Sequence, residues 1–252
     1  MVKKLLTLLL CMTTLLFPLH SLALTADTPL AGTVCWPEGT DENSAAYVYR
    51  YEYPLFVNDS AAAETVNAHF TYLVDDALAF AVPMTTVGLD PAADRASTEI
   101  RTEITCLTDS YLSVLITTTH TFGGETCVVY AAHTFTLQGS MAGSATNLPR
   151  FLGLLSDNET DEWLLERQKD KADALIRKMV WRRLTSFAKN GTLQLDPEIT
   201  EETLEWSFYP EEDFYLNAQE EPVFFLQPGV VSDVSDGRID FTITVSEIDD
   251  EL

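Results

Sequence analysis

The hydrophobic and polar positions of the chain follow regular patterns in several stretches, and these patterns predict its secondary structure. Residues 46–53 are aromatic and β-branched, which predicts a strand. Residues 65–81 place apolar side chains at helical spacing, with two aspartates on the opposite side, which predicts a helix closed by Pro83. A strand followed by a helix therefore opens the ordered part of the chain.

Three β-prone runs fill residues 97–137, and turn signals at 109–110 and at 123–124 separate them. An antiparallel meander is the simplest arrangement of three such runs. If the turns centre on these positions, Cys106 lies opposite Ser113, and Ser113 in turn lies opposite Thr134.

The same register decides whether two cysteines can pair. It places Cys127 seven residues along the strand from the row of Cys106, or about 23 Å at roughly 3.3 Å per residue. A disulfide needs Cα atoms within roughly 7 Å, so a bridge between these two is excluded on this register. It also places His120 opposite Cys127 and His133 opposite Val114.

The longest predicted helix runs from about Asp157 to Lys189. Ser156 and Glu159 form a capping-box signal at its start, and acids crowd its first turns while bases crowd its last. Its apolar stripe is Ala172, Leu175, Ile176, Met179, Val180, Leu184 and Phe187. We expect this stripe to face the core.

The C-terminal third is β-prone. Short apolar runs occupy residues 214–216 and 222–226, and residues 238–248 alternate between apolar and polar side chains. The whole pattern predicts an α+β fold, an antiparallel β-sheet with two main helices packed on one face.

The N-terminus has the pattern of a secretory signal peptide over residues 1–23. Lys3 and Lys4 precede an apolar run, and small residues at Ser21 and Ala23 suit cleavage. A retained signal anchor is the alternative, but the run is shorter than the roughly 20 residues that span a bilayer. We expect cleavage, a secreted or extracytoplasmic location, and no stable membrane span afterwards.

Three segments follow the cleavage site. Residues 24–44 are rich in Thr, Ala, Gly, Pro and Asp and are expected to form a flexible leader. Residues 45–138 form an N-terminal segment of strand, helix and meander, and residues 139–252 form a C-terminal segment of long helix and strands. We expect the two segments to make one compact unit.

The charge limits the choice of partners. The chain has 39 acids and 15 bases, a net charge of −24, and loss of Lys3 and Lys4 with the signal peptide would make it −26. Nucleic acid and anionic membrane surfaces both require a basic footprint, so neither is an expected partner. A cationic partner would be attracted.

Charge is also divided unevenly along the chain. Residues 167–189 hold eight bases, whereas residues 196–252 hold seventeen acids and only Arg238 as a base. We expect the basic helix to be neutralised within the chain or solvated, and binding of an external polyanion is the alternative.

No catalytic, metal-binding or cofactor-binding signature is present. The sequence has no Gly-x-Ser-x-Gly elbow, no nucleotide-binding glycine pattern and no Cys-x-x-Cys, and the histidines are scattered. Carboxylates are too numerous for any one pair to be informative. After signal cleavage Cys35, Cys106 and Cys127 remain, and an odd number leaves at least one thiol free or paired between chains.

The order of several short motifs resembles the RsiV-like extracytoplasmic domain family, tandem domains of unknown function shared with anti-sigma-V factors and peptidoglycan deacetylases. The matching segments are Tyr51-Glu52-Tyr53-Pro54 with Asn58 and Val66-Asn67-Ala68, then Thr121-Phe122-Gly123-Gly124 and Thr134-Phe135-Thr136-Leu137, and finally Phe214-Tyr215-Leu216, Val223-Phe224-Phe225-Leu226-Gln227-Pro228 and Phe241-Thr242-Ile243-Thr244-Val245. Together they cover roughly residues 45–248. The resemblance implies an extracellular sensor, since the anti-sigma factors of this family sense lysozyme.

The chain departs from the family pattern in three ways. The family has Ala-His after its two glycines, where this chain has Glu125-Thr126, and an aromatic after its late proline, where this chain has Pro228-Gly229-Val230-Val231. A ligand role at those positions therefore does not carry over. The layout also differs, because only four residues precede the apolar run and the chain ends at Leu252, without the cytoplasmic segment of the anti-sigma factors or the catalytic domain of the deacetylases. We expect the sensor or accessory part alone.

The candidate ligand-binding residues are Phe122, Gly123, Gly124 and Glu125. The two glycines form either a tight turn that needs positive φ or a loop that contacts a partner, and Glu125 would suit a cationic protein. We expect an exported, non-enzymatic binding or sensing module of the bacterial cell envelope, with a lysozyme-like cationic protein or cell-wall glycan as ligand.

Two other classes of function remain open. One is an envelope hydrolase or an accessory subunit of a peptidoglycan-modifying enzyme, and the other is a purely structural protein. A hydrolase should show a pocket that gathers two carboxylates or a histidine with a shifted pKa. A binding module should show an exposed loop or patch without such a cluster.

Overall fold

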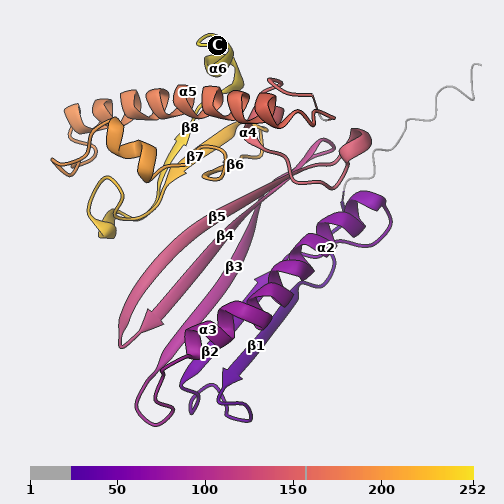
Figure 1. The fold of residues 1–252 in the computed structure, drawn as a ribbon, viewed down its shortest axis with the longest axis vertical. Coiled ribbons are helices and arrows are strands. Elements are labelled where there is room, and N and C mark those ends of the chain that lie inside the picture. Colours follow the sequence, from indigo (N-terminus) through magenta and orange to yellow (C-terminus); the bar gives the residue numbers. More distant parts are fainter. Residues whose placement is uncertain (1–23, 157) are drawn as a thin grey trace, which may run out of the picture.

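The computed structural model describes residues 24–156 and 158–252, so the predicted signal peptide lies outside the described residues. The chain forms a five-stranded sheet in the order β1-β2-β3-β4-β5 and a three-stranded sheet in the order β6-β7-β8 (Figure 1). The strands are β1 (Leu30–Trp36), β2 (Tyr47–Tyr53), β3 (Ala96–Leu107), β4 (Tyr111–Phe122), β5 (Glu125–Thr136), β6 (Phe214–Leu216), β7 (Pro222–Leu226) and β8 (Ile239–Thr242).

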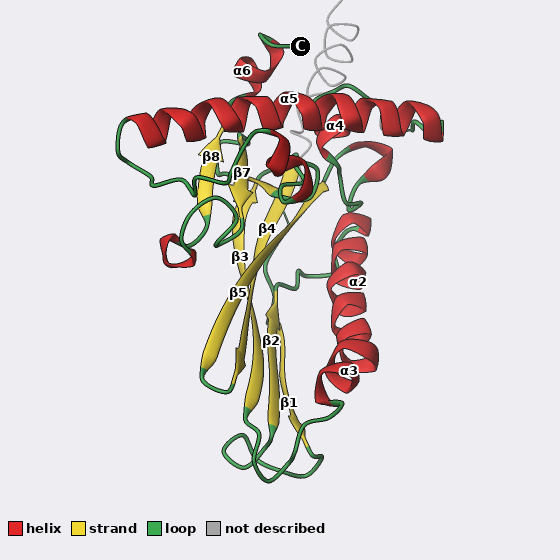
Figure 2. Cartoon of the chain, turned by 60° about the vertical axis from the view of Figure 1, so that its left-hand side comes forward, coloured by secondary structure: helices red, strands yellow, loops and turns green. Residues whose placement is uncertain are grey.

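Helices cover both sheets (Figure 2). They are α2 (Ala61–Asp76), a π-helical turn at Ala77–Ala81, α3 (Val82–Thr86), α4 (Leu148–Phe151), α5 (Glu162–Lys189) and α6 (Val245–Asp249), with short 3-10 turns at Gly139–Met141, Glu202–Trp206 and Val234–Asp236. The predicted α+β class is confirmed, and the five-stranded sheet is mostly antiparallel, with β2 and β3 as its parallel pair. The strands lie in two sheets rather than one, and each sheet is covered by one main helix. Helix α2 packs in one hydrophobic cluster with the five-stranded sheet, and α5 packs in another with the three-stranded sheet.

The predicted meander is confirmed, including its register. Cys106 lies opposite Ser113, and Ser113 lies opposite Thr134. An irregularity between Ile104 and Cys106 shifts the pairing of β3 with β4 by one position. The predicted pairing of β3 with β4 therefore holds next to the turn, at Cys106 and Leu107, and is shifted by one position from Ile104 back to Ala96. The pairing of β4 with β5 holds along its whole length.

The expectation of a flexible leader over residues 24–44 is wrong for much of its length. Leu30–Trp36 forms β1, which pairs antiparallel with β2 along its whole length, from Leu30 opposite Tyr53 to Trp36 opposite Tyr47. The segment looks like a loop by composition, but hydrogen bonding to an aromatic neighbour strand outweighs that local preference. The proposed boundary at residue 138 stays a prediction.

The first helix continues past the proline that was expected to end it. Ser60 caps α2 by accepting a hydrogen bond from the Ala63 amide. At the π-helical turn the amide of Val82 donates to the carbonyl of Ala77, five residues back. Pro83 has no N–H to donate, but it lies in the first turn of α3, directly after this change of hydrogen-bond pattern. The helix therefore continues through α3.

The helices and strands after residue 147, α4–α6 and β6–β8, are called here the C-terminal lobe. In this lobe the start of α5 and the end of β8 differ from expectation. Helix α5 is capped by Asp161, which accepts from the Trp163 and Leu164 amides, and not by Ser156. The predicted strand over residues 238–248 ends at Thr242, because Thr244 and Glu247 form a capping box that starts α6.

The stripe expected to face the core does so, since Ala172, Ile176, Met179, Val180 and Leu184 are buried, with Leu175 and Phe187 packed beside them. Four of the eight bases of α5 pair with acids of the chain, among them Arg177 with Asp173. Lys169 pairs with Glu211 at 2.8 Å, Arg183 with Glu247 at 2.7 Å, and Arg182 with Glu251.

The two lobes meet on the inner half of the β3–β5 meander. Five consecutive residues of β4, 112–116, are buried, because α2 covers one face and the C-terminal lobe covers the other. Ser113 joins the lobes, since its hydroxyl oxygen lies 2.9 Å from that of Thr134 and accepts a hydrogen bond from the Leu216 amide at 3.0 Å. The outer half of the meander projects away from this junction (Figure 1).

Candidate functional site

The four residues singled out from the sequence form the turn between β4 and β5. Phe122 and Glu125 are the last pair of the ladder, and Gly123 and Gly124 make the two-residue turn with φ of 58° and 92°. Positive φ at both central residues matches the right-handed twist of a hairpin and favours glycine. The expected tight turn is confirmed, while contact with a partner stays a prediction.

The aromatic ring at this turn is exposed. Phe122 keeps 58% of its surface accessible, and Val129 on β5 keeps 42%. On β5, His133 and Phe135 pack against rings of α2, so odd-numbered β5 residues point to the face of the sheet that α2 covers, called here the helix face. Val129 and Glu125 are odd-numbered residues of β5, so they point to the helix face, and Phe122, which pairs with Glu125, points there too. All three lie nearer the turn than the buried His133 and Phe135.

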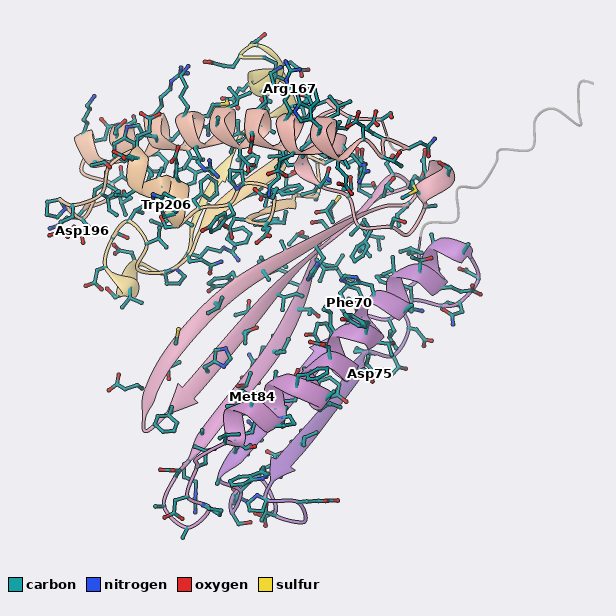
Figure 3. All side chains as sticks on the ribbon, in the orientation of Figure 1. Phe70, Asp75, Met84, Arg167, Asp196 and Trp206 are labelled. Atoms are coloured by element: carbon teal, nitrogen blue, oxygen red, sulfur yellow. The ribbon has the colours of Figure 1, made fainter. Side chains whose placement is uncertain are left out.

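The helix contributes exposed apolar side chains as well. Figure 3 labels Phe70 where α2 packs on the sheet and Met84 farther along, on α3. Phe70 is fully buried, whereas Phe80 and Met84 keep 65% and 72% of their surface accessible. The last turns remain packed through Val82 and Thr86, which are buried, so Phe80 and Met84 are exposed positions on a helix that stays in contact with the core.

The outer hairpin carries almost no charge. The sequence from 110 to 149 contains Glu125 as its single Asp, Glu, Lys or Arg, in a chain whose charged residues make up 21% of the total. Threonines dominate the outer half: Thr117, Thr118, Thr119, Thr121 and Thr126. This neutral hairpin contrasts with the loops beside it.

Two acidic loops lie at the same end of the sheet as the hairpin turn (Figure 1). Residues 37–46 and 87–95, together with Glu125, hold six acids and one base, a net charge of −5. The Asp41 carboxylate accepts hydrogen bonds from the hydroxyl and amide of Ser44, which lower its pKa. This end of the molecule is therefore negative at neutral pH.

A buried pair of carboxyl groups forms a second cluster, in the C-terminal lobe. Asp173 of α5 is only 4% exposed, and Arg177 lies 3.7 Å from it. Burial, together with the neighbouring Glu211, raises the pKa of Asp173 to about 8. Burial opposes ionisation of Glu211 as well, but hydrogen bonds from Asp173 and Lys169 outweigh it and lower that pKa.

The two carboxyls therefore hold one proton between them at neutral pH. A protonated Asp173 that donates to Glu211 gives partners to two buried oxygens, Asp173 Oδ1 and Glu211 Oε2, that otherwise have none. Lys169 balances the remaining negative charge. The cluster ties α5 to the loop that precedes β6.

Two clefts border this cluster. One of about 360 Å³ is lined by Tyr130, Ala131, Ala132, His133, Thr134, Ala145, Thr146, Glu211, Glu212 and Asp213. The other, of about 200 Å³, is lined by Asn147, Pro149, Arg150, Leu165, Glu166, Lys169, Glu211 and Glu212. Burial raises the pKa of Asp213 to about 6, so the first cleft holds a carboxyl that titrates near neutrality.

No motif singles out this carboxyl pair, whose members lie 38 residues apart in the sequence. A signal was available in part, because Asp173 sits next to the apolar stripe of α5, with Arg177 one turn later. Asp173 itself lines neither cleft, which is the feature that separates it from an exposed catalytic acid.

Two of the histidines expected to be scattered meet in the structure. The rings of His69 and His133 lie 4.8 Å apart, and burial lowers the pKa of both, that of His133 to about 4. They are neutral at physiological pH and pack with Phe135. Among the described residues, no group of three or more His, Cys, Asp or Glu is placed to hold a metal ion.

The three cysteines of the described chain are all free thiols. Cys106 is buried, Cys35 is half-buried and Cys127 is exposed on β5. The expectation that Cys106 and Cys127 do not bridge is confirmed. No helix within residues 24–156 and 158–252 is long and apolar enough to cross a bilayer.

Comparison with known proteins gives structural neighbours only. No protein-family model matches the sequence, and no curated protein does. A member of the DUF3298 family from Bacteroides fragilis NCTC 9343 is similar at 15% identity and a TM-score of 0.53, covering 90% of this chain and 92% of that one. A DUF3298 family protein from Pseudomonas aeruginosa PAO1 is 11% identical, with a TM-score of 0.45, covering 90% and 93%.

The first of these likenesses shows a shared fold and nothing finer. The structural neighbours belong to an uncharacterised domain family, and their names state no ligand or activity. The function of this chain must therefore be argued from its own surface.

Proposed function

We propose that this protein is an exported, non-enzymatic binding module of the bacterial cell envelope, and that the outer end of its β4–β5 hairpin docks on a cationic protein. The observation that carries the proposal is Phe122, an exposed aromatic ring held on a two-residue turn next to acidic loops. Aromatic side chains on stiff supports are typical centres of protein interfaces. The acidic loops would attract a basic partner and speed its association.

A lysozyme is the partner that the resemblance to RsiV-like domains suggests. Lysozymes are basic, so their charge complements the net charge of −24. Cell-wall glycan is the other ligand to test, because the same envelope setting would expose the protein to it. The sequence is the basis for the proposed location and ligand. The exposed ring beside the turn is the basis for the proposed place of contact.

The test is binding of residues 24–252 to hen-type lysozyme and to soluble peptidoglycan fragments at two salt concentrations. We expect saturable binding of lysozyme that weakens as salt rises, and at least a tenfold loss of affinity in Phe122→Ala. Trp206→Ala is the matched control, because Trp206 is also an exposed aromatic, at 77%, but lies in the C-terminal lobe. Equal affinity of both variants would overturn the assignment of the turn.

A hydrolase is the second candidate, favoured by the carboxyls that line the clefts. Glu211 lines both clefts, and Asp213, whose pKa burial raises to about 6, lines the larger one. Two carboxyls of unequal pKa in one cleft can serve as base and acid in hydrolysis. Glycan turnover should be followed in the same binding samples. Turnover that disappears in Glu211→Gln would support this second function, and its absence in the wild type would leave the binding function.

A further inference from the structure

β5 is the last strand of the five-stranded sheet, so one side of its main chain faces no other strand. The hydrogen bonds at its far end identify which residues point outward. The Thr136 amide donates to the Ser144 carbonyl, and the Thr134 carbonyl accepts from the Thr146 amide. Even-numbered residues therefore direct their main-chain groups away from β4.

The edge is covered along its inner half only. At Tyr130 the side-chain amide of Gln227 takes the place of a neighbouring strand, because it accepts from the Tyr130 amide at 2.9 Å and donates to the Tyr130 carbonyl at 2.7 Å. The register with β4 is unbroken from residue 125 to 136, so Thr126 and Val128 also point outward. Within the described chain, no hydrogen bond is made to the outward main-chain groups of these two residues.

The free segment, residues 125–129, lacks the features that usually protect a sheet edge. Exposed edges commonly carry charges, prolines or bulges that block pairing with another strand. Glu125, beside the turn, is the one charged residue of the free segment; residues 126–136 contain no charged residue and no proline, and the pairing has no bulge. The opposite edge strand, β1, is bracketed by Pro29 and Pro37.

The free segment is also symmetric about one residue. Cys127 is exposed at its centre, and both the turn residue Gly124 and the covered residue Tyr130 lie three positions away. A second copy related by a two-fold axis at Cys127 would therefore use the whole free segment of each strand. Longer pairing is blocked equally at both ends, by the turn and by Gln227.

We propose that the β5 edge is a self-association surface, on which two copies pair antiparallel through residues 125–129. Thr126 of one copy exchanges both main-chain hydrogen bonds with Val128 of the second, and Glu125 faces Val129 rather than another acid. Cys127 faces its own counterpart in a non-hydrogen-bonded position, where Cα atoms lie about 4.5 Å apart. That separation falls within the range that a disulfide bridges.

Salt separates this proposal from the function proposed above. Two copies each with a net charge of −24 repel one another, so added salt should strengthen self-association. Binding of a cationic protein should weaken under the same change. Failure of one proposal therefore leaves the other testable.

The experiment combines trapping with hydrogen exchange on residues 24–252. Native protein at high concentration is treated with oxidised glutathione, which takes two electrons and two protons from the paired thiols, forming one intermolecular disulfide and two glutathione thiols. We expect a dimer linked through Cys127 in the wild type and in Cys35→Ser, and none in Cys127→Ser. Exchange of the Thr126 and Val128 amides should slow at least tenfold as concentration and salt rise, also in Cys127→Ser.

Val128→Lys tests the edge without removing the thiol. A lysine there sets two like charges close together across the proposed pairing, and cross-linking should fall at least tenfold. Thr119→Lys is the matched control, because Thr119 lies opposite Val128 on β4, one strand away from the edge, and should cross-link like the wild type. Equal cross-linking of both lysine variants, or amide exchange independent of concentration, would overturn the proposal. Protection that appears only with lysozyme present, while the chain stays monomeric, would instead assign the edge to a partner's strand.

Discussion

The inner and outer halves of the β3–β5 meander belong to the same strands but differ in burial, in side-chain polarity and in what packs against them. On β4 the inner half, residues 112–116, is buried on both faces, whereas residues 117–122 are half-buried or exposed. The inner half packs between α2 and the C-terminal lobe. The outer half carries threonines, a free thiol and an exposed aromatic ring.

This difference divides one hairpin into a core-forming half and an exposed half. The buried half uses consecutive apolar residues, as strands covered on both faces do. The outer half contributes little to the core, so its side chains are free to be selected for contact with another molecule. Variants placed in each half should separate stability from binding.

The largest difference is expected from truncating aromatic rings. Phe135 is fully buried among rings of α2 and β5, so Phe135→Ala should lower the free energy of unfolding by about 3–5 kcal/mol. Phe122→Ala should change it by less than about 0.5 kcal/mol, since that ring is exposed. Urea unfolding followed by circular dichroism measures both. A comparable loss in the two variants would contradict the division of the hairpin into two halves.

A smaller loss is expected where the inner half joins the C-terminal lobe. Ser113→Ala removes the acceptor of the buried Leu216 amide and the partner of Thr134, and should cost about 1–3 kcal/mol. Thr119→Ala, on the same face of the outer half, is the control and should cost less than about 0.5 kcal/mol. The same denaturant titration applies, and a loss in Thr119→Ala equal to that in Ser113→Ala would refute this account of the junction.

The smallest effect concerns pH. The folded-state pKa of Asp173 is raised to about 8, so its favourable contribution is fully present below its unfolded pKa and is lost as pH rises through 8. Between pH 7 and 9 the wild type should lose about 1 kcal/mol relative to Asp173→Asn, which keeps a donor toward Glu211. Melting temperatures across this window, with Ser113→Ala as a control that keeps every titratable group, test the expectation. Parallel curves for wild type and Asp173→Asn would show that no proton is shared.

The sequence predicted the meander well because its turns are local. Gly123 and Gly124 allow a two-residue turn, and that turn alone sets the pairing of all of β5 with β4. Element boundaries were predicted less well. The alternation after residue 238 suggested a long strand, while Thr244 and Glu247, three residues apart, already contained the capping box that ends it.

The candidate site was predictable to the same extent. The exposed turn follows from its glycines and from the apolar runs on either side. The Asp173–Glu211 pair and the meeting of His69 with His133 did not follow, because each joins elements far apart in the chain. Spacing along the sequence carries no information about such contacts.

The sequence by itself determined the hairpins, the core-facing stripe of α5 and the near absence of charge on the outer hairpin, since these depend on neighbours within a few residues or on composition. Only the tertiary structure decided that the strands divide into two sheets, that residues 30–36 join the first of them, and that Gln227 covers the edge of β5 at Tyr130. The physical reason is that these outcomes depend on which distant surfaces bury each other best, a competition that local periodicity does not settle.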